Sequence, residues 1–254
     1  MIIRKSKYQI GLMRTAGKIV ADAHTAMLEA VKPGVSTFEL DAIVYKLIIS
    51  NKAIPTFKGY RGFPASICAS VNEQVVHGFP SKDVILKEGD IISIDIGATY
   101  KGMVGDSAFT YKVGKVSEEV EKLLKATNDG LYAGIAKMVA GNHLEEVSGA
   151  VEDVALQYKF GIVRQYGGHG VGASMHEDPF LFNYRTGDKG PILKPGMTIA
   201  IEPMFNLGCD EVHTLEDRWT VITNDKKPSA HFEHSVLITE NEPEILTDRG
   251  WIFQ

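Results

Sequence analysis

Cysteine is scarce in this sequence of 254 residues, which contains only Cys68 and Cys209. Two cysteines cannot form the set of disulfides that holds small secreted domains together, so we expect a protein of the reducing cytoplasm. Long apolar runs are also absent, and none approaches the ~20 residues that a transmembrane helix needs. The first 18 residues carry early charges and no continuous apolar stretch, so we expect no secretory signal peptide.

An excess of basic residues is missing as well. Lys and Arg number 27 against 32 Asp and Glu, which gives a net charge of -5, and no basic stripe accompanies this balance. The charge argues against a dedicated nucleic-acid-binding protein, and we expect neither DNA nor a membrane as a partner. The chain does have the composition of a globular protein, 44% hydrophobic and 23% charged, with enough length for a large core.

The predicted elements follow the same order twice along the chain. Ser6 can cap a long amphipathic helix that ends at residues 32–34, and the capping-box spacing of Ser36 and Glu39 starts a helix over 38–49. Strands are expected at 65–71 and within 91–111. A second long helix pattern begins at Ser117, and residues 142–145 start a helix that continues over 147–158.

A glycine-rich extended stretch at 166–175 and a strand at 198–202 come next, followed by strands at 219–223 and 230–238, which we expect to pair with each other. Each part of the chain therefore has two helices and then strands. We predict one α+β domain over 1–254, built of two pseudo-symmetric halves of about 1–114 and 115–254.

Two aspartates lie in a predicted hairpin over residues 90–111. A turn centred between Tyr100 and Lys101 would place Asp95 directly opposite Asp106 on one face, while the other face is apolar. Like charges at this range raise each other's pKa, and no Lys or Arg lies beside them on the strands. A cation bound between the aspartates is one interpretation. An exposed, solvated sheet end is the alternative.

Three more residues with metal-binding side chains lie in the second half. Glu202 ends an apolar strand before Pro203, Glu233 lies within a strand that should be buried, and His169 is flanked by glycines that allow close backbone approach. Alone, each glutamate has an ordinary interpretation as a solvated strand end. A phosphate-binding loop around His169 is disfavoured, because the spacing matches neither GxGxxG nor a Walker motif. We assume ordinary surface or core positions for His24, His143, His213, His231 and His234.

Considered together, five residues make an oxygen-rich ligand set: Asp95, Asp106, His169, Glu202 and Glu233. Four carboxylates and one imidazole are enough for two divalent cations about 3.5 Å apart. The four negative charges nearly cancel two dications, which favours a dinuclear centre over a single Ca²⁺ or Mg²⁺.

Five segments carry a resemblance to a known family, and they are ASVNEQVVHGFP, SIDIGATYKGMVGDSAFT, YGGHGVGASMHEDP, TIAIEPMF and SAHFEHSVLIT. In this order and spacing they resemble the type I methionine aminopeptidases over essentially the whole chain. The resemblance implies the pseudo-two-fold "pita-bread" fold, also called the creatinase/aminopeptidase fold. This is an α+β architecture with curved antiparallel sheets at the centre and helices packed outside.

The resemblance also assigns the ligands. It implies that Asp95 chelates one metal ion, that Asp106 and Glu233 bridge both, and that His169 and Glu202 complete the shell of the other. The cofactors would be two divalent ions of Co, Mn, Fe, Ni or Zn, and the ligand types do not distinguish among these metals.

The implied reaction is the removal of N-terminal methionine from nascent polypeptides and short peptides, preferably before a small second residue. Metal-activated water would attack the first peptide bond, with Glu202 as general base, His176 stabilising the tetrahedral intermediate and His77 positioning the substrate. We expect a monomer, and transient ribosome contact is left open.

The family's apolar pocket for the methionine side chain corresponds here to Tyr60, Phe63, Cys68, Met175 and Trp219. The sequence departs from many bacterial members at three places: Phe57 replaces a common cysteine, Phe63 a tyrosine and Met175 a phenylalanine. These changes keep the pocket apolar, and the sequence does not determine the shape that results. Plain core packing is the alternative role for Phe57 and Phe63.

Two other functions stay open. A prolidase or Xaa-Pro aminopeptidase would share the fold and the five ligands, although such relatives usually carry an additional amino-terminal domain that we do not expect here. A non-catalytic binding module on the same fold is the second alternative. It is disfavoured because all five ligand residues are present.

Overall fold

Four α-helices and a series of short β-strands make up residues 1–251, the part of the chain that the computed structural model describes. The helices are α1 (Lys7–Ala30), α2 (Thr37–Ser50), α3 (Glu118–Ile135) and α4 (Leu144–Tyr158), with a short 3-10 helix at Tyr60–Gly62. The strands are β1 (Ile54–Pro55), β2 (Ile67–Val71), β3 (Gln74–Val76), β4 (Ile91–Tyr100), β5 (Met103–Lys112), β6 (Gly161–Ile162), β7 (Gly168–Gly170), β8 (Glu177–Leu181), β9 (Thr198–Ile201), β10 (Met204–Asn206), β11 (Val212–Thr214), β12 (Val221–Thr223), β13 (Ser229–His231), β14 (His234–Leu237) and β15 (Glu244–Ile245).

Capping residues fix where the first helices begin. Ser6 accepts a hydrogen bond from the Gln9 backbone while the Gln9 side chain binds the Ser6 backbone, and Ser36 and Glu39 form the same box before α2. Both predicted starts are therefore confirmed. The start of α4 lies one residue later than predicted, because the His143 backbone N–H donates to Oε1 of Glu146 at 2.9 Å.

All strand pairs within the described residues are antiparallel. One sheet has the order β1-β4-β2 with β5 on the other edge of β4, and a five-stranded sheet has the order β15-β14-β9-β7-β8. Two smaller sheets, β13-β10-β6 and β11-β12-β3, complete the set. The predicted combination of antiparallel sheets with helices outside them is confirmed.

The hairpin of β4 and β5 has a different register from the predicted one. Asp95 pairs with Ala108 and Asp106 pairs with Gly97, so the two aspartates are diagonal neighbours rather than directly opposed. The turn is centred between Lys101 and Gly102, which both have positive φ, 46° and 82°, as tight two-residue hairpin turns require. Both aspartates still lie on one face, because the shift in the turn moves the register by two residues.

The predicted pairing of 219–223 with 230–238 is wrong. Strand β12 pairs with β11 and β3, while β13 pairs with β10 and β14 pairs with β9. The segment 230–238 is split because its two ends belong to different sheets, with Phe232 and Glu233 between them. The Glu233 backbone N–H instead donates to the Ala108 carbonyl on β5, at 2.9 Å.

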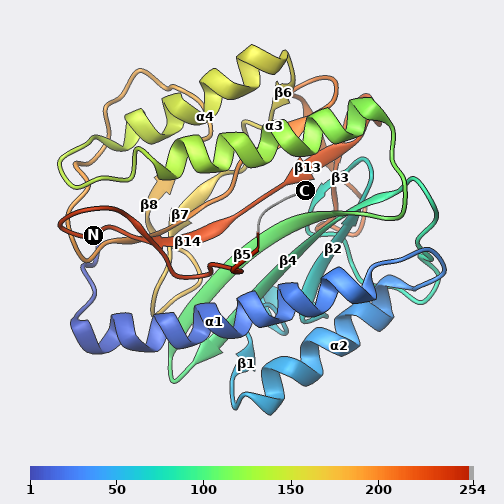
Figure 1. The fold of residues 1–254 in the computed structure, drawn as a ribbon, viewed down its shortest axis with the longest axis horizontal. Coiled ribbons are helices and arrows are strands. Elements are labelled where there is room, and N and C mark those ends of the chain that lie inside the picture. The colour runs from blue at the N-terminus through green and yellow to red at the C-terminus, as the bar shows by residue number, and fades with distance from the viewer. Residues whose placement is uncertain (252–254) are drawn as a thin grey trace.

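Two pairs of helices enclose the sheets (Figure 1). α1 lies along β4 and β5, with α2 beside it against β1 and β2. On the opposite side α3 covers β9, β10 and β13, and α4 packs against α3 and β6. The apolar row Ile92, Ile94 and Ile96 on β4 is fully buried, in a core that continues to residues of α3 and α4. The opposite face of β4 and β5 carries the two aspartates, so the polar side chains of this hairpin lie on the side away from that core.

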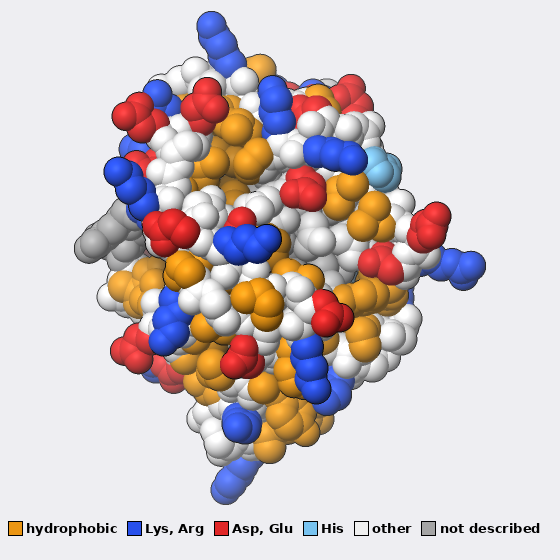
Figure 2. Space-filling model, turned by 90° about the vertical axis from the view of Figure 1, so that its right-hand side faces the viewer, with side chains coloured by type: hydrophobic (Ala, Val, Ile, Leu, Met, Phe, Trp, Pro, Cys, Tyr) orange, Lys and Arg blue, Asp and Glu red, His pale blue; other side chains and the backbone are white. Residues whose placement is uncertain are grey.

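The approach of α1 to β5 depends on glycine. A Cβ at Gly105 would lie 2.6 Å from the backbone nitrogen of Gly17, closer than real side-chain contacts allow. The outer surface is mixed, and on the face shown in Figure 2 acidic and basic side chains are interspersed among apolar ones. Within residues 1–251, no helix combines the length and apolar sequence needed to cross a membrane.

Candidate metal centre and substrate cavity

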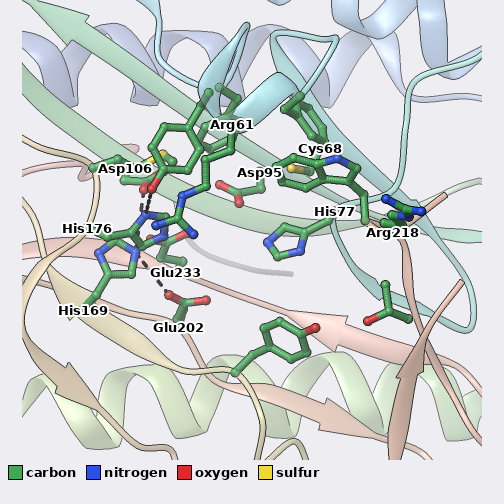
Figure 3. A pocket seen from close by; sticks show the side chains of 17 residues that line it. Arg61, Cys68, His77, Asp95, Asp106, His169, His176, Glu202, Arg218 and Glu233 are labelled. Carbon is green, nitrogen blue, oxygen red and sulfur yellow. Dashed lines mark hydrogen bonds and ion pairs between the residues drawn. The ribbon is translucent and has the colours of Figure 1, made fainter. Parts of the chain in front are cut away.

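A cavity of about 460 Å³ lies on the aspartate face of the β4–β5 hairpin. The structure brings the five predicted ligands and all seven predicted substrate-contacting residues to its wall (Figure 3). These residues are Asp95, Asp106, His169, Glu202, Glu233, His77, His176, Tyr60, Phe63, Cys68, Met175 and Trp219. Residues more than 170 positions apart in the sequence thus line one cavity.

Two strand breaks place the glutamates. Glu202 follows β9 and precedes Pro203, which has no N–H to donate to a strand ladder, and Glu233 lies between β13 and β14. His169 lies in the middle of β7 and is 7% exposed. The sequence signal of carboxylates at interrupted strands therefore marked positions that face the cavity.

The ligand atoms are close together. One atom from each of Asp106, His169 and Glu233 lies within 4.8 Å of the other two. Nε2 of His169 is 3.4 Å from Oε1 of Glu202 and 4.0 Å from Oδ2 of Asp106. Figure 3 shows these four side chains converging, with Asp95 beside them.

Burial makes the carboxylate cluster electrostatically unfavourable without cations. Desolvation raises the pKa of Asp95, Asp106, Glu202 and Glu233, and repulsion from Asp106 raises the pKa of the other three further. Oδ1 of Asp95 and Oδ1 of Asp106 are buried without a hydrogen-bond partner among the described residues. Cations would supply both the missing partners and the missing charge, so these residues fit a metal site.

The histidines around the cavity are neutral near pH 7. Burial lowers the pKa of His169 and of His77 to about 4 in each case, and electrostatic repulsion from the nearby His176 is the second cause. Burial also lowers the pKa of His176, whose Nδ1 is 2.9 Å from the Tyr60 hydroxyl. A neutral imidazole can bind a metal through one nitrogen or donate a hydrogen bond through the other.

One end of the cavity is apolar. Phe57, Phe63, Ala65, Cys68 and Met175 form a buried cluster against which Tyr60, Phe79 and Trp219 pack. Phe63 is 2% exposed and contacts Trp219 edge-on at a ring distance of 5.1 Å. These aromatics therefore pack as core residues and line the cavity at the same time, so the two interpretations of Phe57 and Phe63 are compatible.

Several residues near the site were not singled out from the sequence. Arg61 and Arg218 line the cavity with left-handed backbones, φ of 47° and 65°, a conformation that non-glycine residues often adopt at functional sites. No sequence pattern marks such positions. His231, which we had assumed to be ordinary, is buried with its Nε2 3.6 Å from Oε2 of Glu202. Its position two residues before Glu233 on an extended segment was an available signal.

Arg249 also supports the site, although it does not line the cavity. Its Nη2 donates to the Ser107 hydroxyl at 2.7 Å, to the Ala108 carbonyl at 2.7 Å and to the Glu233 carbonyl at 3.0 Å. One guanidinium thus joins the strand that carries Asp106 to the break that carries Glu233.

Comparisons with known proteins agree with this geometry. The sequence profile of metallopeptidase family M24 matches residues 11–240. A methionine aminopeptidase 1 from Bacillus subtilis is 51% identical, over 97% of this chain and 99% of its own length.

Two solved structures show the same fold. A methionine aminopeptidase from Thermotoga maritima superposes with a TM-score of 0.96 at 42% identity, covering 98% of this chain and 100% of that chain. A prolidase from Pyrococcus furiosus superposes with a TM-score of 0.77 at 25% identity, covering 97% of this chain and 65% of the prolidase. The pita-bread architecture that the sequence resemblance implied is therefore confirmed.

Proposed function

The chain belongs to metallopeptidase family M24, and from that premise we propose that it removes the N-terminal methionine from nascent proteins and peptides, preferably before a small second residue. The observation that carries the proposal is a single cavity with two parts. One part is the cluster of metal-binding side chains, and the other is an apolar end that suits the apolar side chain of methionine. The identity of 51% to a methionine aminopeptidase over nearly the full chain supports the same activity.

Membership of a metallopeptidase family implies divalent metal ions. We propose two of them, held by Asp95, Asp106, His169, Glu202 and Glu233, because four carboxylates balance two dications. When bound, the cations would polarise the scissile carbonyl and lower the pKa of a water molecule. Co, Mn, Fe, Ni and Zn are all compatible with carboxylate and imidazole ligands.

The other side chains would orient the substrate and move protons. Glu202 would take a proton from the attacking water and pass it to the leaving amine, a role for which burial suits it by raising its pKa. His176, held by the Tyr60 hydroxyl, would donate a hydrogen bond to the carbonyl oxygen as negative charge develops there. His77, packed edge-on against Trp219, would position the substrate chain.

The apolar end of the cavity would hold the methionine side chain. Phe63, Cys68 and Met175 present aromatic rings and sulfur atoms, which suit an unbranched thioether. The free amine of the substrate would lie near the carboxylates, which limits cleavage to the first residue of a chain. We also propose that the protein is a monomer and that it consists of pseudo-symmetric halves at about 1–114 and 115–254. A cytoplasmic location is part of the same proposal, and the free thiols of Cys68 and Cys209 support it.

Peptide cleavage tests the proposal directly. Protein loaded with Mn²⁺ or Co²⁺ should release methionine from Met-Ala peptides, should act far more slowly on Leu-Ala peptides, and should leave intact those Xaa-Pro peptides in which Xaa is not methionine. Preferential cleavage of these Xaa-Pro peptides would favour the prolidase alternative, because the prolidase from Pyrococcus furiosus has a similar fold. Failure to cleave any peptide with each of the five metals would favour a binding module.

A further inference from the structure

Two interrupted strands lie against each other beside the candidate metal centre. The break at Glu202 and Pro203 separates β9 from β10, and the break at Phe232 and Glu233 separates β13 from β14. β10 pairs with β13 through Met204 and His231, and the Phe232 backbone N–H donates to the Pro203 carbonyl at 3.3 Å. This register places the last residue of β13, His231, next to Glu202.

The His231 side chain is enclosed and incompletely bonded. The residue is 2% exposed, and its Nε2 is buried without a hydrogen-bond partner among the described residues. That nitrogen lies 3.6 Å from Oε2 of Glu202, while the other oxygen of Glu202 lies 3.4 Å from Nε2 of His169. The Glu202 carboxylate is therefore held between two imidazoles.

His24 shows what an ordinary buried histidine looks like in this fold. It is 0% exposed, with Nδ1 2.8 Å from the Tyr111 hydroxyl and Nε2 2.8 Å from the Ser107 carbonyl. Both of its ring nitrogens have partners, as buried polar groups normally do. Nε2 of His231 differs because it has no such partner within residues 1–251, and it lies 3.6 Å from the carboxylate of Glu202, a proposed metal ligand.

The backbone of His231 is fixed to the strand that carries Asp106. The His231 N–H donates to Oγ1 of Thr110 at 2.9 Å, and the Thr110 hydroxyl donates to the His231 carbonyl at 2.8 Å. Thr110 lies on β5, four residues after Asp106. The imidazole thus projects from a rigid base, which is what a group that orients another side chain needs.

We propose that His231 is a positioning residue, which donates a hydrogen bond from Nε2 to Oε2 of Glu202 and so keeps Oε1 turned toward His169. The 3.6 Å separation exceeds an ordinary N–H···O bond by a few tenths of an ångström, so a small rotation of the carboxylate completes the bond. Hydrogen bonds of this kind fix the orientation of metal-binding side chains. The role rests on the proposed function of Glu202, and His231 itself is not among the residues that line the cavity.

The first test compares His231→Leu, which removes the donor, with His231→Gln, which keeps an N–H donor on a side chain of similar reach. Loss of a group that orients a metal ligand typically costs 10- to 100-fold. We therefore expect the kcat of His231→Leu on a Met-Ala peptide to fall by about 10- to 100-fold with KM nearly unchanged, and its Mn²⁺ affinity by calorimetry to weaken by about tenfold. His231→Gln should recover most of both losses.

The matched control is His143→Leu, which removes a partly exposed imidazole at the start of α4 that is not among the residues lining the cavity. Its Mn²⁺ affinity should equal that of the wild type. The proposal is overturned if His231→Leu keeps the wild-type affinity and kcat, or if His231→Gln is as impaired as His231→Leu, which would indicate packing alone.

A second measurement needs no variant that folds poorly. Nitrogen NMR of wild-type protein labelled at histidine should show a proton on Nε2 of His231 in the zinc-loaded form, with His231→Gln used only to assign the signal. An unprotonated Nε2 would overturn the hydrogen bond. Both this signal and the Mn²⁺ affinity remain measurable if no Met-Ala peptide is cleaved, so a failure of the proposed function is distinguishable from a failure of this inference.

Discussion

Asp106 illustrates the balance on which the site depends at the scale of single residues. It is 3% exposed and shares its surroundings with Asp95, Glu202 and Glu233. Burial raises the pKa of its carboxyl, so the ionised form opposes folding at every pH above the ordinary carboxyl value near 4. The same group becomes favourable only when a cation neutralises it.

The substitution Asp106→Asn should therefore change stability in opposite directions with and without metal. In chelator at pH 8 we expect the variant to be more stable than the wild type by about 1–3 kcal/mol, because each unit by which folding raises a pKa costs ~1.4 kcal/mol. With Mn²⁺ the wild type should be the more stable protein, and the Mn²⁺ affinity of the variant should be at least about 100-fold weaker. Urea unfolding and calorimetry measure the two effects.

The contrary result would be informative. If Asp106→Asn lowered the stability of the metal-free protein at pH 8, the carboxylate would be making favourable contacts in the absence of cations, and the argument for a metal site from electrostatic cost would fail. At pH 4 the metal-free variant and wild type should differ much less, since the wild-type carboxyl is then protonated in the folded state.

At the scale of elements, the short segment after β15 contributes a residue, Arg249, that supports the candidate site. Arg249 donates to Ser107, Ala108 and Glu233, and its Nη1 lies 3.0 Å from Nε2 of His234. Its ring contacts add to this, with the guanidinium 5.0 Å from the centre of the Phe109 ring. This short segment closes the molecule behind the cavity and joins sheets that no regular strand ladder connects.

Replacement of Arg249 by Leu should destabilise the protein by at least about 3 kcal/mol, because several buried acceptors lose a charged donor at once. The Mn²⁺ affinity of any folded Arg249→Leu protein should also fall, since the backbone that carries Glu233 loses its support. Arg14→Leu is the matched control: Arg14 pairs with Glu244 at 2.6 Å on the surface, where such pairs contribute less than about 1 kcal/mol. Equal unfolding midpoints for the two variants in urea would contradict the proposed support.

At the scale of the whole molecule, pH controls the metal site through the carboxylates rather than through His169. Burial raises the pKa of all four carboxylates, whereas it lowers that of His169 to about 4. As the pH falls, protons therefore compete for the carboxylates first, and His169 stays neutral until near pH 4.

As the pH is lowered from 8, we expect Mn²⁺ affinity and kcat/KM to begin falling before pH 5 is reached. An unperturbed carboxylate would be protonated only at a lower pH. The stability gained from saturating Mn²⁺ should be larger at pH 8 than at pH 5, because the raised pKa values make the metal-free protein less stable as the pH rises. Calorimetry and urea unfolding across this range give both quantities. An affinity that is constant from pH 8 to pH 4.5 would rule out the raised carboxyl pKa values.

The surface has the mixed character that the net charge of -5 indicated. On the face in Figure 2, Lys and Arg side chains alternate with Asp and Glu, and no large region of that face has a single sign. The carboxylates Asp95, Asp106, Glu202 and Glu233 gather instead in the cavity.

Much of the architecture could be predicted because it depends on neighbouring residues. The capping boxes at Ser6 and Ser36 involve residues three apart, and the apolar rows of α1 and β4 follow the periods of a helix and a strand. Ligand chemistry was likewise readable, because carboxylates such as Glu202 and Glu233 are conspicuous inside apolar strands. These local signals indicated an α+β domain and a set of metal-binding side chains, whereas the family, its fold and the pocket residues were implied by the resemblance of five motif segments to the type I methionine aminopeptidases.

The sequence by itself determined which side chains could bind metal and where most helices begin, because these properties lie within a few consecutive residues. Only the tertiary structure decided the register of Asp95 against Asp106, the partners of β12, and the positions of His231 and Arg249 beside Glu202 and Glu233. Each of these depends on the packing of segments far apart in the chain, whose free energy is shared among many contacts and leaves no local pattern.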